Sequence, residues 1–171
     1  HIRRRLPDRV DITITERTPV VRMNVRGRKG DTGRVADTDG VVFQCRRGTS
    51  MLPVVREAQA PGTMPGKRLK GRALAALRLV ETCREADFLE LGVLEVDISK
   101  ADYLCATLGD YSTAKIAWHG MDDPTEGTRR EMTDTLVNLR HAIRSKVGSG
   151  AKVWNATNPG YVYSDTKEKI Q

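Results

Sequence analysis

The feature that most constrains this chain is one long amphipathic segment near its C-terminal end, residues 128–147. Apolar side chains recur along it at spacings of three and four residues, namely Met132, Leu136, Leu139, Ile143 and Val147. This spacing places them along one side of an α-helix, and the opposite side carries Asp134, Asn138, His141 and Ser145. We therefore predict a helix that packs on a core and presents a polar side outwards.

The flanking sequence predicts further helices before this one and a hairpin after it. Ser99 with Asp102 resembles a capping box, which predicts a helix to about residue 108. Ser112 can cap a second short helix to about residue 119, and a stronger helical pattern covers residues 67–86. Asn158-Pro159-Gly160 predicts the turn of a hairpin over residues 151–164.

The N-terminal part has strand-like patterns instead. Residues 10–55 alternate loosely between apolar and polar side chains, and Asp39-Gly40 is a strong hairpin signal. The segment 61–66 is rich in Pro and Gly and predicts a linker. We thus expect an α+β chain, with a small antiparallel β unit in residues 1–60 that includes a basic N-terminal arm. A helical domain follows over residues 67–171 and ends in a winged helix-turn-helix with its core at 98–163.

Four short motifs in this order resemble the effector domain of OmpR-type response regulators. Residues 98–104 resemble the start of the family's first helix, and residues 112–120 its short second helix with a terminal Trp-Gly. Leu136-x-x-Leu139-Arg140-x-x-Ile143 is similar to the recognition helix, and Gly160-Tyr161-Val162-Tyr163 to the end of the wing. The resemblance covers about 65 residues, and no receiver domain accompanies it.

The resemblance implies DNA contacts at specific positions. The recognition helix, residues 128–147, would enter the major groove through Asp134, Asn138 and His141, and the wing, residues 151–164, would contact the backbone or the minor groove through Thr157 and Asn158. Thr157 stands where the family has Arg, which weakens the minor-groove contact. The loop 121–130 would be the one that contacts RNA polymerase in family activators.

Charge favours the same class of partner. The chain has 29 Lys and Arg against 22 Asp and Glu, a formal net charge of +7, and cations placed on phosphates release counterions. Further DNA contacts are expected from side chains on or beside the helix, the wing and the basic clusters, namely Arg130, Arg144, Ser145, Lys152, Arg28, Lys29, Lys67 and Arg68. The alternative for each cluster taken alone is a solvated surface.

Three functional hypotheses follow. The first is a DNA-binding protein, a bacterial or phage transcriptional regulator that binds double-stranded DNA, compatible with a homodimer and with contact to RNA polymerase. The second is a winged-helix protein-interaction module that docks on RNA polymerase or on a replication or segregation complex. The third is a DNA-processing enzyme with an unrecognised site.

Other classes receive little support. Cys45, Cys83 and Cys105 form no CxxC pair, so free thiols in a reducing cytoplasm are expected. Asp37-x-Asp39-Gly40 lacks the later ligands of a calcium loop, and no phosphate-binding loop or catalytic triad stands out. We expect no metal, no cofactor, no catalytic residue and no enzymatic activity. No signal peptide or apolar run of ~20 residues is visible, and we expect a cytoplasmic, nucleoid-associated protein without a membrane partner.

Overall fold

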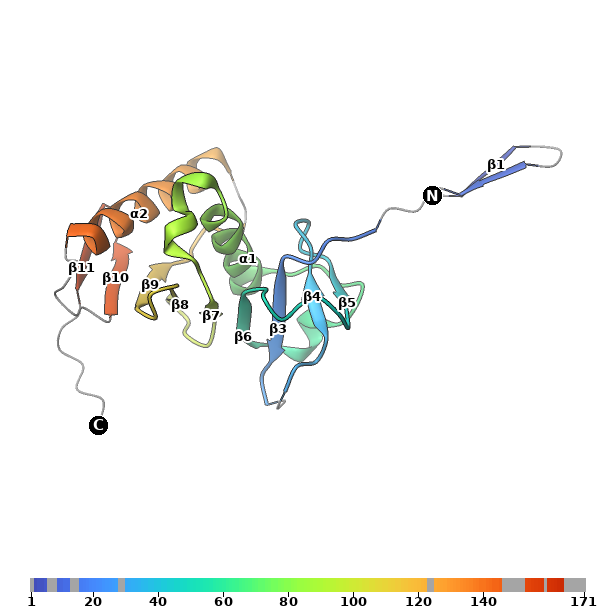
Figure 1. Ribbon diagram of the computed structural model, residues 1–171, viewed down its shortest axis with the longest axis horizontal. Coiled ribbons are helices and arrows are strands. Elements are labelled where there is room, and N and C mark those ends of the chain that lie inside the picture. Colours follow the sequence, from blue (N-terminus) through green and yellow to red (C-terminus); the bar gives the residue numbers. More distant parts are fainter. Residues whose placement is uncertain are drawn as a thin grey trace.

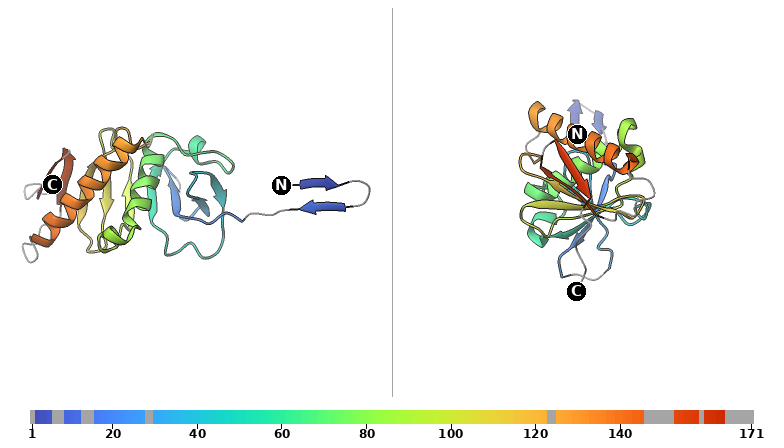
Figure 2. Two further views of the ribbon diagram at one scale, coloured as in Figure 1. Left: turned by 90° about the horizontal axis from the view of Figure 1, so that it is seen from above. Right: turned by 90° about the vertical axis from the view of Figure 1, so that its left-hand side faces the viewer.

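The computed structural model describes residues 2–5, 9–12, 16–27, 30–122, 125–145, 153–158 and 160–164. Its centre is a nine-stranded mixed sheet with two α-helices lying over one face (Figures 1 and 2). The strands of this sheet are β3 (Val21–Val25), β4 (Arg34–Ala36), β5 (Val42–Gln44), β6 (Val54–Ala58), β7 (Glu95–Asp97), β8 (Tyr103–Thr107), β9 (Thr113–Ala117), β10 (Val153–Asn158) and β11 (Tyr161–Ser164). The helices are α1 (Gly71–Cys83) and α2 (Glu126–Ser145), with the 3-10 helices η1 (Ala60–Thr63) and η2 (Ala86–Leu91).

The strand order explains where the helices lie. The sheet runs β11-β10-β9-β8-β7-β6-β3-β4-β5. Strand β6 is parallel to its neighbours β3 and β7, β9 is parallel to β10, and the remaining pairs are antiparallel. Parallel neighbours require a crossover connection of a dozen or more residues, usually helical. Helix α1 lies in the crossover from β6 to β7, and α2 lies in the crossover from β9 to β10.

The prediction of a winged helix-turn-helix is wrong, because the segments expected to form its first two helices contain strands β8 and β9. In β8 and β9 every second residue is buried, namely Leu104, Ala106, Ala114 and Ile116. Five-residue strands that alternate in this way bury one face and leave the other open. Such short segments carry too few apolar residues for the sequence to separate a period of two from a period of 3.6.

The predicted helix caps act as turns. The backbone N–H of Ser99 donates to the Asp97 carboxylate (2.7 Å), so Ser99 starts a loop rather than a helix. The Asp110 carboxylate accepts from both the N–H (2.9 Å) and the hydroxyl (2.6 Å) of Ser112, which closes the β8–β9 hairpin. Asp and Ser favour turns because their side chains satisfy nearby backbone groups.

The long helix is where the sequence predicts it, within two residues at each end. Met132, Leu136 and Leu139 of α2 are buried and Ile143 is half-buried, while Val147 lies outside the described residues. The predicted hairpin also exists as β10 and β11. It is not a free wing, however, because β10 pairs in parallel with β9 and so belongs to the main sheet.

The N-terminal strands form the predicted antiparallel unit, β3-β4-β5, with a turn at residues 37–40. Strand β3 also pairs with β6, so this unit is continuous with the rest of the sheet. The predicted helix 67–86 begins later, at Gly71. Strands β1 (Ile2–Arg5) and β2 (Arg9–Ile12) form a separate hairpin that stands away from the sheet (Figures 1 and 2).

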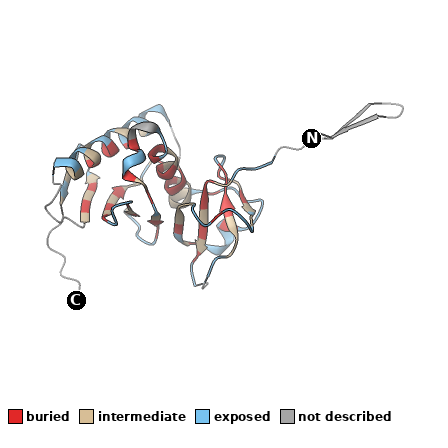
Figure 3. Ribbon diagram, in the orientation of Figure 1, coloured by how far each residue is buried: buried red, intermediate tan, exposed pale blue. Residues whose placement is uncertain are grey.

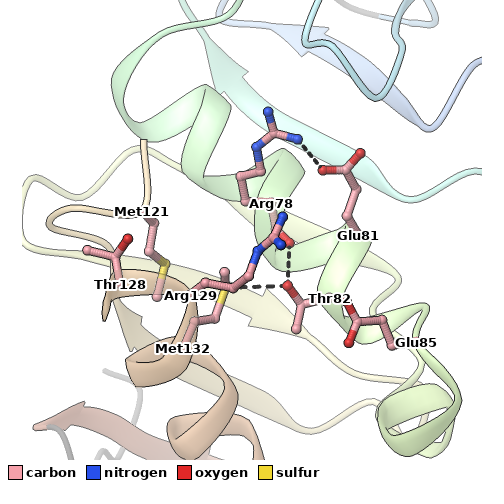
Figure 4. Close-up of a pocket in the computed structure, with 8 residues that line it drawn as sticks. All are labelled: Arg78, Glu81, Thr82, Glu85, Met121, Thr128, Arg129 and Met132. Atoms are coloured by element: carbon pink, nitrogen blue, oxygen red, sulfur yellow. Dashed lines mark hydrogen bonds and ion pairs between the residues drawn. The ribbon is translucent and has the colours of Figure 1, made fainter. Parts of the chain in front are cut away.

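The core lies between the helices and the covered face of the sheet, where Figure 3 shows buried residues facing one another. A small cavity of about 50 Å³ remains where α1 meets α2 (Figure 4). There the Thr82 hydroxyl donates to the carbonyl of Arg78 (3.0 Å) and lies 3.9 Å from the sulfur of Met132. Arg78 donates to the Thr38 carbonyl (3.0 Å), so this junction also ties α1 to the β4–β5 turn.

Candidate functional site

The two ends of the sheet differ in how their edges are satisfied. At one end, the N–H of Val42 in β5 donates to the carbonyl of Lys67 (2.8 Å), and the Val42 carbonyl accepts from Gly66 (2.7 Å). The chain at residues 66–69 therefore covers the start of β5, at Val42. At the other end, no described residue pairs with the outer side of β11. An unpaired edge presents backbone donors and acceptors to another chain.

Strand β11 exposes two aromatic side chains. Val162 is half-buried against the core, whereas Tyr161 and Tyr163 have exposed fractions of 72% and 54%. Alternate residues of a strand face opposite sides of the sheet, so the two tyrosines share one face. Tyrosine combines a large apolar ring with a hydroxyl, which makes it frequent in protein interfaces.

A cleft of about 310 Å³ lies between α2 and β11. Helix α2 contributes Asn138, His141 and Ser145, β10 contributes Trp154, and β11 forms the other wall. None of the residues that line it is Asp, Glu, Lys or Arg. The cleft is therefore a neutral, hydrogen-bonding recess directly beside the open edge.

Trp154 is the one residue of this cleft with an unsatisfied polar group. Its side chain is buried (3% exposed), and its indole N–H has no hydrogen-bond partner among the described residues. A buried donor without an acceptor costs on the order of 1–3 kcal/mol.

The structure brings three of the sequence-predicted contact residues together and separates the others. Asn138, His141 and Ser145 meet in the cleft, whereas Arg130 and Asp134 are exposed on α2 outside its lining. Arg144 donates to the Glu90 carboxylate (2.6 Å), which holds the end of α2 against η2.

The predicted wing and basic-cluster residues lie elsewhere. Thr157 donates from its hydroxyl (2.7 Å) and its N–H (3.1 Å) to the Asn155 side chain, and Asn158 lies opposite Tyr161 in the hairpin. Lys67 and Arg68 line a second, larger groove near β6. The remaining three predicted contacts, Arg28, Lys29 and Lys152, fall outside the described residues.

Sequence reasoning assigned Tyr161 and Tyr163 to the end of a wing and did not select them among the contact residues. The sequence does contain a signal for an aromatic strand face, because residues 161–164 have an aromatic side chain at every second position. An aromatic face on a strand that the core does not cover indicates a contact surface.

The titratable groups with shifted pKa values lie away from the cleft. Burial, with a smaller effect of Glu85, raises the pKa of the Cys83 thiol to about 12. Burial, with a smaller effect of Asp97, also raises the pKa of Cys105. Both changes lower the thiolate fraction near neutral pH. Within the part of the chain that the structure describes, no group of three His, Cys, Asp or Glu could hold a metal ion.

None of the described helices is long and apolar enough to cross a membrane. A comparison with protein-family models found no match for this chain, and a search of curated proteins found no similar sequence. The geometry of the sheet edge and its cleft is therefore the basis for a functional proposal.

Proposed function

We propose that this protein is a protein-binding module that pairs an extended segment of a partner with the open edge of β11. The observation that carries the proposal is the contrast between the two sheet edges, since residues 66–69 cover β5 and no described residue covers β11. Strand addition uses the repeating backbone N–H and C=O groups of an edge for affinity and pockets beside it for specificity.

The cleft supports this mode of binding because it lies where side chains of an added strand would point. Side chains of the added strand would lie beside β11, where Tyr161, Val162 and Tyr163 line the cleft. The lining, which has no Asp, Glu, Lys or Arg, favours a partner with a small polar side chain that can hydrogen-bond to Asn138, His141 or Ser145.

DNA binding, which the sequence favours, retains the support of the net charge of +7. The position of α2 gives it no further support, because Asn138, His141 and Ser145 lie beside β11 and Tyr161 rather than on an isolated helix face. Strand addition accounts for the same three residues through their place in the cleft. It is therefore the function that the geometry favours.

The test is selection of binding peptides followed by proline substitution. Peptides of random sequence displayed on phage are selected against the wild-type protein, and the tightest is measured against Val162→Pro and Tyr163→Pro. Successive residues of an antiparallel strand direct their N–H groups to opposite sides. One of the two prolines therefore removes an N–H from the β10–β11 pairing, and the other removes an N–H from the outer edge.

We expect the outer-edge variant to keep its thermal stability and to lose the peptide. The matched control is Tyr111→Ala, which removes a tyrosine with an exposed fraction of 81% from the β8–β9 turn, and it should bind as wild type does. Retention of binding by a fully folded outer-edge proline variant would overturn the proposal. Dimerisation of the free protein through β11, measured by light scattering and abolished by the same proline, would instead identify a second copy as the occupant.

A further inference from the structure

A second surface, independent of the β11 cleft, is a groove of about 550 Å³ between the end of β6, η1 and the start of α1. Four strands lie between β6 and β11 in the sheet, so the two sites are well separated. The groove is lined by five cationic side chains and a single carboxylate, Glu57. The cations are Arg26, Lys67, Arg68, Lys70 and Arg72.

The backbone that carries these cations is held in place. The N–H of Val42 donates to the Lys67 carbonyl, and the N–H of Leu69 donates to the Gly40 carbonyl (both 2.8 Å). The guanidinium of Arg72 donates to the carbonyl of Lys100. Loop residues fixed in this way lose less freedom when a ligand binds than residues of a free loop would.

The charges at the groove are largely uncompensated. Within the part of the chain that the structure describes, Lys67, Arg68 and Lys70 have no carboxylate within salt-bridge distance. The N-terminus of the 13-residue helix α1 adds to the positive potential, because Lys70 at its N-cap makes no side-chain capping bond and its first turn has no acidic residue.

Glu57, the acidic residue of the groove, has an unusual backbone conformation. Glu57 has a φ of 62°, in the left-handed region that non-glycine residues rarely adopt, at the point where the β3–β6 register shifts. Its carboxylate lies 3.5 Å from the Arg26 guanidinium. Residues held in this conformation cluster at ligand sites, where the surrounding structure fixes them. The carboxylate compensates only one of the five cations.

We propose that this groove binds a compact ligand that carries two or more phosphate-like groups. Lysine and arginine are the side chains suited to phosphate oxygens, and Pro61, Ala73 and Ile98 supply apolar surface for an organic part. The volume is in the range of small-ligand sites, roughly 300–1,000 Å³. A duplex would instead contact a surface of roughly 1,000–2,500 Å², which a single recess with thirteen lining residues does not supply.

The experiment is calorimetric titration of the whole chain with sodium tripolyphosphate in low salt. We expect binding that weakens about tenfold or more in the double variant Lys67→Ala/Arg68→Ala, since each lost cation removes a charge-assisted hydrogen bond. The matched control is Arg129→Ala/Arg130→Ala on α2, which removes the same charge from exposed positions and should bind within twofold of wild type. Glu57→Gln should bind several-fold more tightly, because it removes the competing carboxylate.

Two further probes identify the source of the phosphate groups. Binding to vesicles that contain phosphatidylglycerol, displaced by tripolyphosphate and lost in the Lys67/Arg68 variant, would support a lipid headgroup. Tripolyphosphate binding without vesicle binding would support a soluble ligand. Equal weakening in the groove and control variants, no tripolyphosphate binding, or binding only to a 20-base-pair duplex would each overturn the proposal. The melting temperature of every variant is measured first, so that loss of binding is not confused with loss of folding.

Discussion

The two edge strands of the nine-stranded sheet, β5 and β11, differ in how their outward-facing backbone groups are covered. The β5 edge is covered at its start by the chain itself, because the Val42 N–H donates to the Lys67 carbonyl and the Gly66 N–H donates to the Val42 carbonyl. The β11 edge has exposed tyrosines and a neutral cleft instead of a covering segment among the described residues. Natural proteins usually block sheet edges against unwanted pairing. Among the described residues the β11 edge has no such cover, and this contrast is the basis of the proposed binding surface.

The largest expected effect comes from breaking the covered edge with Val42→Pro. The proline removes the N–H that donates to the Lys67 carbonyl and replaces a fully buried valine. We expect a loss of about 4 kcal/mol in the free energy of unfolding, measured by urea denaturation. The matched proline on the outer side of β11 should cost less than about 1 kcal/mol. Equal costs at both edges would remove the basis of the comparison.

The covering segment depends on a single apolar anchor, Leu69. Its side chain is buried, and its N–H donates to the Gly40 carbonyl. Leu69→Ala should lower the free energy of unfolding by about 3 kcal/mol. It should also increase hydrogen exchange at Val42, as the covering segment opens. An unchanged exchange rate at Val42 in this variant would show that the segment is held by other contacts.

A substitution at Gly40 tests the β4–β5 turn, against which the covering segment, residues 66–69, packs. Its φ is +74°, and an added Cβ would lie 3.2 Å from the Cδ1 of Leu74. Gly40→Ala should therefore cost more than the roughly 1–2 kcal/mol that an L-residue costs in this conformation, because Leu74 must also move away from the added Cβ. The control is Gly48→Ala, where φ is also positive but no atom lies within 4 Å of the added Cβ. A larger loss at Gly48 than at Gly40 would contradict this packing.

The smallest effect on stability is expected at the open edge. Tyr161→Ala and Tyr163→Ala should change the free energy of unfolding by less than about 1 kcal/mol, because both side chains are largely exposed. Each should nevertheless weaken binding of a selected peptide about tenfold or more, as expected for aromatic contact residues. Tyr111→Ala should change neither property. Wild-type affinity in both tyrosine variants would place the peptide on another surface.

Part of this fold can be predicted from the sequence because some signals are long or specific. The stripe of α2 from Met132 to Ile143 extends over several turns, and the Asp39-Gly40 turn has a defined chemistry. Strands β8 and β9 could not be distinguished from helices, because each has only five residues and Ser and Asp occur in both caps and turns. The secondary structure of short segments is decided by tertiary pairing, and here β8 pairs with both β7 and β9.

Part of the candidate site could be predicted from the sequence. Asn138, His141 and Ser145 were selected as a polar helix face, and they do lie together, in the cleft beside β11. What they face depends on β10 pairing in parallel with β9, a contact between residues some 40 positions apart. No local pattern indicates such a pairing. For the same reason, the open edge of β11 and the covered edge of β5 emerge only when the sheet is assembled.

The most direct test of the central claim is amide hydrogen exchange at the two edges, before and after addition of a selected peptide. In the free monomer we predict slow exchange at Val42, whose N–H is hydrogen-bonded to Lys67, and fast exchange at the outward-directed amides of Tyr161–Tyr163. Addition of the peptide should slow exchange at those β11 amides at least about tenfold and leave Val42 unchanged. Protection of every β11 amide in the free monomer, or no change on peptide binding, would contradict the account.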